Sequence, residues 1–487
     1  MSNPKSRTTW RRIPKGAAAV ALAAAPSAAS REIVRSIAAV GIPRTSRART
    51  PKEDLIGLLR LAAEVEHALM VQYLYAAASV RGPTPEGVDA GRDIAIVAIQ
   101  EMGHLVTVQN LLLAIADINP QIPEPNHYHH LGRDGLRAKS KSNPIPFVLE
   151  PISHSALAKY VTIEKPPEID EPALAARVER LGQEAKESAG TEPHPVSALY
   201  AAIYWIFQPS DDFHLQSGDG QSGELELTIQ MGFQAGWHLA PGDYRDPATI
   251  DNFATVADEW PSAPDVIFGL ARNAQEACSA VSKIVAQGEG PARAGESADS
   301  HFKRFLNLLD RFESNQLTVK ALPRTPFVDG SLAPEDPNAT LITNQYTTLW
   351  GRLFNLRYSI LLLSIAHALF LPRSNPGRKI LINYAQQNMK PVLISLTKQM
   401  LGLQLGKEEE GPKAGPTYGL LDEPLPDTDR EFWARHKRLF DDQVQVIAAI
   451  RASPEYGADD EGPICLDTIA EKDGPVSDLL IRRTSPA

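Results

Sequence analysis

Two polar side chains on an otherwise apolar helical stretch restrict the fold of this chain more than any other feature. Glu101 and His104 are three residues apart, so they lie on one face of a helix, one turn from each other. A carboxylate and an imidazole that face a hydrophobic seam are costly unless something pairs with them, and a metal ion is one such partner. In metal-binding helical bundles, a Glu-x-x-His motif opposite a Glu of the neighbouring helix is the recurring ligand set. The face is otherwise apolar, with Ile94, Val97, Ala98, Leu105, Val108 and Leu112.

The facing carboxylate is predicted on the helix that precedes this one. Residues 52–80 carry apolar side chains at helical spacing, and Glu66 falls on the same stripe. Glu64 does not; it follows Arg60 by four residues, where a surface ion pair is the ordinary explanation. The sequence therefore predicts Glu66 as the inward carboxylate. The stripe is made of Leu55, Leu59, Ala62, Met70, Tyr73 and Ala77.

The rest of the chain is predicted to be helical, with long connections rich in proline and glycine. His301 begins an apolar stripe and is predicted to point inward. The last 30 residues or so are polar, and we expect them to be loose. The further helices are expected over 90–118, 168–190, 194–207, Asp265–Ala286, Ser300–Phe312, Thr343–Phe370, Lys379–Leu403 and Asp427–Ala452.

Composition argues against several functional classes. Lys+Arg is 49 and Asp+Glu is 59, a formal charge of −10, and no basic tract outside the N-terminal arm suggests a nucleic-acid partner. Cys278 and Cys465 are far apart, so neither a thiolate metal site nor a disulfide framework is expected. No stretch reaches the roughly 18–20 apolar residues of a membrane span. The longest run, Ile360–Leu371, contains Ser364 and His367 and is expected to be a buried core helix.

The chain is predicted to have four parts. Residues 1–50 form a basic, Ala-rich arm that is flexible or helical, 51–320 a metal-binding core, 321–420 a helical extension packed on it, and 421–487 a helix and loose tail. Arg11-Arg12 before the Ala-rich run 17–29 also has the outline of a twin-arginine export signal. We favour a cytoplasmic protein, with export as the alternative.

Several motifs occur in the order of a known family. They are Glu66-His-Ala-Leu-Met-Val-Gln-Tyr, Glu101-x-x-His104, Ile284-Val-Ala-Gln-Gly-Glu-Gly and Ser300-His-Phe-Lys-Arg-Phe, together with Leu149-Glu-Pro, Glu164-Lys-Pro-Pro and Phe354-Asn-Leu-Arg-Tyr. With these motifs, residues 52–420 resemble ferritin-like domains of the iminophenyl-pyruvate dimer synthase type, from the violacein, rebeccamycin and staurosporine pathways. The resemblance implies an all-α fold: a ferritin-like four-helix bundle core with long loops and additional C-terminal helices.

The resemblance also implies a set of metal ligands. Family members usually carry two further carboxylates, at the positions that Ala198 and Ala298 occupy here. Their loss predicts a lopsided site instead of a symmetric two-metal site. The ligand positions that transfer to this chain are Glu66, Glu101, His104, Glu289 and His301.

Carboxylate and imidazole ligands suit iron, manganese or zinc. The resemblance favours iron, as one or two ions, in an oxidoreductase that acts on an amino-acid-derived small molecule with dioxygen or peroxide, as in specialised-metabolite biosynthesis. The alternative is a non-catalytic ferritin-like protein that stores metal or serves as a scaffold. The sequence leaves the oligomeric state open.

Five other histidines are predicted to lie outside the metal site. His127, His129 and His130 form either a metal-binding cluster or a polar loop, and we favour the loop. His238 and His367 have no partner pattern and are predicted to be structural.

Four aromatic residues have two interpretations each. Tyr73 lies two turns after Glu66 and is predicted to be a core residue, although a hydrogen bond to a metal ligand is the alternative. Trp205, Phe207 and Trp237 either line a substrate pocket or pack in the core.

Overall fold

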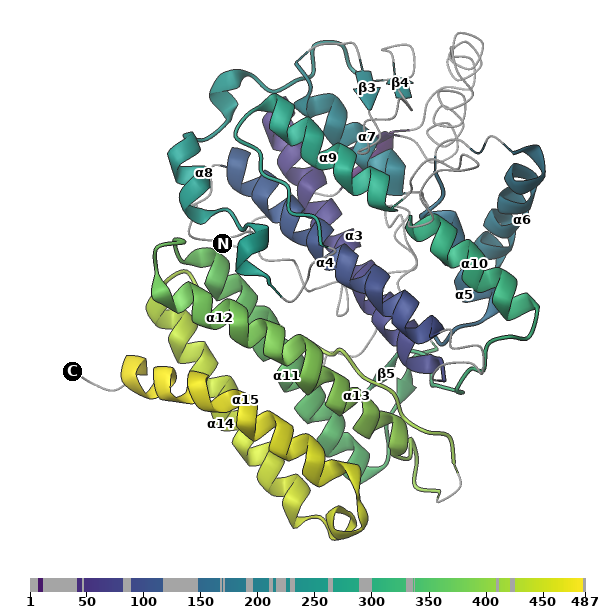
Figure 1. The fold of residues 1–487 in the computed structure, drawn as a ribbon, viewed down its shortest axis with the longest axis vertical. Coiled ribbons are helices and arrows are strands. Elements are labelled where there is room, and N and C mark those ends of the chain that lie inside the picture. Colours follow the sequence, from purple (N-terminus) through teal and green to yellow (C-terminus); the bar gives the residue numbers. More distant parts are fainter. Residues whose placement is uncertain are drawn as a thin grey trace.

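The computed structural model of the chain is almost entirely helical, which confirms the all-α prediction (Figure 1). Three two-stranded sheets, with strands of two to four residues, are the extended elements in the part that is described. The structure describes residues 8–11, 42–45, 48–81, 89–116, 148–166, 169, 171–189, 196–209, 213–215, 225–227, 233–261, 266–288, 300–329, 336, 338–408, 411–420 and 425–484.

Two long antiparallel helices, α3 (Pro51–Ser79) and α4 (Ala90–Ile115), form the central layer. Each begins at a side-chain cap: the Thr50 hydroxyl accepts from the Glu53 amide, and the Asp89 carboxylate accepts from the Arg92 amide. Both helices are buried on most of their circumference, because other helices cover them on two sides (Figure 1). Side chains of this central layer therefore reach two separate interiors.

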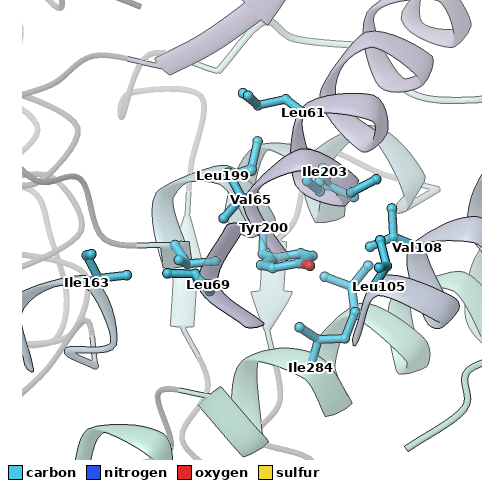
Figure 2. Packing of buried hydrophobic residues seen from close by; sticks show 14 of the residues in the cluster. Leu61, Val65, Leu69, Leu105, Val108, Ile163, Leu199, Tyr200, Ile203 and Ile284 are labelled. Atoms are coloured by element: carbon cyan, nitrogen blue, oxygen red, sulfur yellow. The ribbon is translucent and has the colours of Figure 1, made fainter. Parts of the chain in front are cut away.

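Five helices lie beside one face of the central layer: α5 (His154–Ile163), α6 (Pro172–Ala189), α7 (Val196–Phe207), α9 (Ala274–Gly288) and α10 (His301–Glu313). Buried apolar side chains from α3, α4, α5, α7 and α9 interdigitate there (Figure 2). Each fully buried leucine in such a cluster contributes roughly 2 kcal/mol to folding. The labelled members of this cluster are Leu61, Val65, Leu69, Leu105, Val108, Ile163, Leu199, Tyr200, Ile203 and Ile284.

The predicted helix Asp265–Ala286 begins later than expected, at Ala274. Residues 266–271 form no helix beside α4, because side chains of α4 pair with their backbone. The Thr107 hydroxyl accepts from the Gly269 amide at 2.9 Å, and the Asn110 side-chain amide donates to the Gly269 carbonyl at 2.8 Å. Tertiary hydrogen bonds thus replace the helical ones over this stretch.

The C-terminal helices lie against the other side of the central layer (Figure 1). The predicted helix Lys379–Leu403 is interrupted by a π-helical segment, Asn388–Val392, which contains Pro391. Proline lacks the amide hydrogen that a regular helix needs, which accounts for the irregular turn. These helices are α11 (Gln345–Phe370), α12 (Pro376–Gln387), α13 (Leu393–Gly402), α14 (Asp429–Ala452) and α15 (Glu461–Thr484).

The expectation of a loose C-terminal tail is wrong. Helix α15 occupies residues 461–484 and contacts α12, α13 and α14. Its apolar residues are spaced for one helical face, and they complete the core between the C-terminal helices. Charged residues lie between these apolar positions, so the sequence of the tail reads as polar. The buried members are Cys465, Leu466, Ile469, Val476 and Leu480.

The short elements lie at the ends of the helical layers. In the N-terminal arm, β1 (Thr8–Arg11) pairs antiparallel with β2 (Ile42–Thr45), so these residues form strands where a helix was the alternative to a flexible arm. The antiparallel pair β3 (Phe213–Leu215) and β4 (Leu225–Leu227) lies beside α7. The remaining elements are α8 (Pro247–Phe253), the parallel pair β5 (Pro326–Phe327) and β6 (Thr340–Leu341), and the 3₁₀ turns Pro241–Asp243, Ala257–Glu259 and Pro454–Ala458.

Two helices, α4 and α11, are long and apolar enough to cross a membrane by length and composition. Their apolar windows are 83% and 72% buried inside the protein, as in the core helices of many folds. Their apolar character is therefore explained by the packing on both sides of the central layer.

Candidate metal centre

The Glu-x-x-His motif of α4 forms the middle of a buried polar cluster. Glu101 and His104 are 1% and 2% exposed, and the Glu101 Oε2 and His104 Nδ1 atoms are 2.8 Å apart. The spacing of three residues places both on the face of α4 that contacts α3 and α10. The structure therefore places both in the interior that the sequence predicted.

Glu66 of α3 reaches the same imidazole from the opposite helix. Its Oε2 atom lies 3.4 Å from His104 Nδ1, and the Tyr200 hydroxyl of α7 donates to its Oε1 atom. Glu66 is 1% exposed, whereas Glu64 is partly exposed, in keeping with the choice made from the apolar stripe. Glu66, Glu101 and His104 offer ligand atoms that all lie within 4.8 Å of one another.

A second triad shares Glu101 with the first. The Glu101 Oε1 atom is 3.1 Å from Nδ1 of His301, the first residue of α10, and His301 Nδ1 is 3.6 Å from Glu164 Oε2. Glu164 caps the C-terminus of α5 and is 2% exposed. The two imidazole rings lie 5.5 Å apart between their centroids. The two triads thus form one cluster with Glu101 between them.

Both imidazoles have the same arrangement of neighbours. Each turns Nδ1 toward two carboxylates and Nε2 toward a glutamine: His104 Nε2 is 3.0 Å from Gln287 Oε1, and His301 Nε2 is 3.1 Å from Gln100 Oε1. Because a glutamine oxygen only accepts, Nε2 carries the hydrogen in each pair. The neutral ring then presents its Nδ1 lone pair to the carboxylates, as a metal-binding histidine does.

Among the described residues, three buried atoms of the cluster lack a hydrogen bond of good geometry and face other triad atoms at 3.1–3.6 Å: Glu66 Oε2, Glu101 Oε1 and His301 Nδ1. A buried polar atom without a good hydrogen bond costs about 1–3 kcal/mol. All three belong to the triads, and oxygen and nitrogen donors at such spacing are what a divalent iron, manganese or zinc ion accepts. The donor set therefore fits a metal.

The ionisation of the cluster also fits exchange between protons and a cation. Burial raises the pKa of Glu66 to about 7, and the nearby Glu101 adds to this effect. Burial alone would lower the histidine pKa values, but the facing carboxylates raise the pKa of His104 to about 10 and that of His301 to about 9. Burial would raise the pKa of Glu101, but the charge of His301 and the hydrogen bonds from His104 and His301 together lower it. Metal binding would release the imidazole protons.

Glu164 is the candidate ligand that the sequence prediction missed. It was noted only within the family motif Glu164-Lys-Pro-Pro, and the missing carboxylate was sought at Ala198 of α7. Ala198 is buried and carries no ligand atom; α7 contributes through Tyr200, two residues later. A glutamate directly after the apolar helix α5 and before Pro166 was the available signal.

The predicted ligand Glu289 lies outside the described residues, as do Ala298 and the histidines at 127, 129 and 130. Gly288, the preceding residue, closes α9 against the cluster. A Cβ atom at Gly288 would lie 3.4 Å from Glu164 Oε2 and 3.9 Å from His301 Nδ1. The chain therefore approaches the triads immediately before Glu289.

The contacts of the four aromatic residues distinguish between the interpretations predicted for them. Tyr73 is buried, and its hydroxyl donates to Glu164 Oε1 at 2.5 Å, so it contacts a candidate ligand as well as the core. Trp205 and Phe207 are buried members of the hydrophobic cluster, and Trp237 donates to Asp54 at 3.1 Å. The contacts of these three indicate packing.

The two histidines predicted to be structural pair with other groups. His238 Nδ1 lies 2.7 Å from the Trp205 carbonyl oxygen, and His367 Nε2 lies 2.7 Å from Asp429 Oδ1. Neither belongs to a cluster of potential metal ligands among the described residues.

Comparison with known proteins gives one family and two individual matches. A ferritin-like family model matches residues 59–310, a range that contains both triads. Dichlorochromopyrrolate synthase of Lentzea aerocolonigenes is 24% identical over 420 residues, which are 78% of this chain and 38% of that protein. The chain thus spans about two fifths of the length of this curated relative.

A crystal structure at 1.95 Å of a ferritin-like protein from Caulobacter vibrioides matches with 17% identity and a TM-score of 0.36. The match covers 69% of this chain and 93% of that one. A likeness at this TM-score carries no argument about the site.

Proposed function

Because the chain belongs to the ferritin-like family, we propose that it is a metal-dependent oxidoreductase with a non-haem iron centre. The observation that carries the proposal is the pair of buried triads that share Glu101. Carboxylates and imidazoles that project inward from neighbouring helices are the donor groups with which helical bundles hold metal ions. The proposed ligands are Glu66, Glu101, His104, Glu164 and His301, with Glu289 as a further candidate.

Iron or manganese in this site would supply redox chemistry with dioxygen or peroxide, whereas zinc would supply Lewis acidity. The chain's own residues exclude water, since every residue of the two triads is 2% exposed or less. Gln100 and Gln287 hold the imidazoles in one tautomer. Tyr73 and Tyr200 orient the outer carboxylates of Glu164 and Glu66 by hydrogen bonds.

The proposed substrate is an amino-acid-derived small molecule of specialised metabolism. Support comes from the likeness to dichlorochromopyrrolate synthase. A reaction of the imine-dimer synthase type is the narrower form of this proposal. Since the chain spans 38% of that relative, its reaction need not be the same.

A non-catalytic metal-binding or scaffold protein is the second candidate. The burial of all five described ligand candidates favours it, because none is more than 2% exposed. The alanine at position 198, where a carboxylate was expected, favours it as well.

Metal content tests the site. We expect one or two equivalents of iron in protein reconstituted with ferrous ion without chelators, measured by elemental analysis. The double variant Glu101→Ala/His104→Ala should lose all of it, because both triads contain Glu101. The variant Glu164→Ala should lose no more metal than the second triad holds.

Glu64→Ala is the matched control, since it removes a carboxylate of the same helix outside the cluster. Folded wild-type protein without metal, or a Glu101→Ala/His104→Ala variant that keeps its metal, would contradict the site. For catalysis, oxygen is added to the anaerobic ferrous protein. Metal binding without a spectral change or peroxide turnover would exclude the oxidoreductase and leave the scaffold.

A further inference from the structure

A second interior lies between the central layer and the C-terminal helices, on the side away from the triads. It is a cavity of about 380 Å³ between α3 and α4 on one side and α11, the π-helical segment and α13 on the other. This volume lies in the range of small-molecule sites. None of the five described ligand candidates lines it, so it is distinct from the candidate metal centre.

The wall of the cavity is apolar and adaptable. Three of the six methionines of the chain, Met70, Met102 and Met389, line it from three different elements. Methionine side chains are flexible and polarisable, so they fit apolar groups of irregular shape. Leu362 and Leu393 belong to the same wall. The interior therefore favours an apolar body.

The charged residues of the lining have one sign. Lys320, Lys390 and Lys398 line the cavity, and no Asp or Glu occurs among the described lining residues. The chain as a whole carries a formal charge of −10, so a lining whose described charged residues are all lysines is a local reversal of its charge. An ammonium group on a flexible stem suits a carboxylate at the edge of an apolar site.

One edge of the cavity reaches the surface. Ile394 lines the cavity and is 52% exposed, and Lys390 and Lys398 lie four residues before and after it, both exposed. Four-residue spacing places these three side chains on one face of the helical stretch. Met389, Leu393 and Leu401 continue the neighbouring stripe inward. The lysines thus stand beside an opening that leads to apolar side chains.

Buried hydrogen bonds of Asn388 fix the π-helical segment at this opening. The Asn388 side chain accepts a hydrogen bond from the Arg357 guanidinium and donates to the Tyr384 carbonyl at 3.0 Å. Asn388 and Arg357 are both fully buried. Single π turns occur frequently at functional sites, and this one presents Met389 and Lys390 to the cavity. The irregular turn is fixed by a dedicated buried network.

We propose that this cavity binds an amphiphilic monocarboxylate. The apolar body of the ligand occupies the space between α3, α4 and α11, and its carboxylate lies at the lysines of the rim. The proposal does not depend on the metal centre, because the two sites share no lining residue.

A fluorescent fatty acid tests the proposal. Dansyl-undecanoate should bind the full-length protein saturably, and its methyl ester should bind more weakly. The variant Lys320→Met/Lys390→Met/Lys398→Met should lose about tenfold in affinity for the acid, since exposed charge pairs contribute modestly one by one, and nothing for the ester. Equal affinity of acid and ester for the wild type would overturn the proposal.

Filling the cavity supplies an independent check. Ala78→Phe on α3 and Ala95→Phe on α4 each place a ring in the cavity and should abolish probe binding. Ala449→Phe is the matched control, since Ala449 is exposed on α14. Circular dichroism and thermal melting identify variants that fail to fold. Unchanged binding in either folded cavity variant would refute the assignment.

Competing ligands distinguish whether the bound carboxylate is aliphatic or aromatic. Displacement of the probe by dodecanoate would assign a fatty acid, and displacement by 2-naphthoate an aromatic acid. Displacement by neither would contradict the proposal.

Discussion

Each imidazole of the candidate metal centre has two unlike ring nitrogens, and this asymmetry sets what the site can do. Gln287 and Gln100 accept hydrogen bonds from the Nε2 atoms of His104 and His301. Both Nδ1 atoms therefore face the carboxylates. A proton or a metal ion can lie between each Nδ1 atom and the facing carboxylates. One of them is required, because buried carboxylates without a positive partner are costly. The glutamines therefore fix which ring nitrogen of each histidine faces the carboxylates.

A different buried histidine makes the stability of the fold dependent on pH. His436 of α14 is fully buried, and neither ring nitrogen has a hydrogen-bond partner among the described residues. Burial, and then the neighbouring His367 of α11, hold its pKa well below the usual 6.5. His367 is itself paired with Asp429 of α14. Because the folded pKa is depressed, the neutral ring stabilises the fold above pH 6.5, and this contribution is lost as pH falls.

We expect His436→Phe to flatten the acid side of the stability profile. Below pH 6.5 the unfolded state takes up one more proton than the folded state, a slope of up to about 1.4 kcal/mol per pH unit. Urea unfolding at pH 7.5, 6.5 and 5.5 measures it. His154→Gln, at a site where the side chain is 43% exposed, should keep the wild-type slope. An identical slope in His436→Phe and the wild type would contradict this explanation.

Helix α4 depends on a glycine inside its metal motif. Gly103 lies between Met102, which lines the apolar cavity, and His104, which belongs to the triads. The segment 266–271 lies directly against it: a Cβ atom at Gly103 would lie 2.3 Å from Val266 Cγ1 and 3.1 Å from the Ile267 carbonyl oxygen. The close approach of the two backbones thus outweighs the low helix propensity of glycine.

We predict that Gly103→Ala destabilises the protein by about 1–3 kcal/mol, the usual cost of overpacking. Gly474→Ala is the matched control, because α15 leaves open space around that exposed position. It should stabilise the fold by about 0.5–1 kcal/mol, the ordinary gain from replacing a helical glycine. Chemical denaturation of the two variants gives both values, and equal signs would refute the packing argument.

Some helix boundaries can be predicted from the sequence, and others depend on the tertiary structure. The helices α3, α4 and α11 were predicted closely, since long apolar stripes have a clear period. The start of α9 was not, because Gly269 pairs with Thr107, and a partner so remote in sequence cannot be predicted from local spacing. The break at Asn388–Val392 has a local cause in Pro391, which the predicted helix Lys379–Leu403 did not take into account.

The molecule as a whole has two interiors that share the central layer. One contains the candidate metal centre, and the other is closed by the C-terminal helices, whose centre is the buried Arg357. Arg357 donates to Asp473 of α15 at 2.7 Å and to Gln443 of α14 at 2.8 Å. Tyr384 of α12 donates to the same Asp473 carboxylate at 2.6 Å. One carboxylate of the last helix thus links α11, α12 and α15.

Asp473→Ala should destabilise the protein by about 3–5 kcal/mol, since it leaves the Arg357 charge buried without its partner. The neighbouring control Asp467→Ala removes an exposed carboxylate of α15 and should change the free energy of unfolding by about 0.5 kcal/mol or less. Thermal melting compares them. A loss of stability no larger in Asp473→Ala than in Asp467→Ala would mean that α15 does not hold the C-terminal helices together.

The sequence by itself determined the helices of the central layer and the inward direction of Glu66, Glu101, His104 and His301. Periodicity is local, so the face that a side chain occupies follows from spacing within its own helix. Which faces meet is a different matter. Glu164 entered the cluster because α5 ends beside α10, and α15 was buried because three other helices offered it an apolar surface. Only the tertiary structure brings together residues so distant in the chain, since their contact depends on packing among many helices.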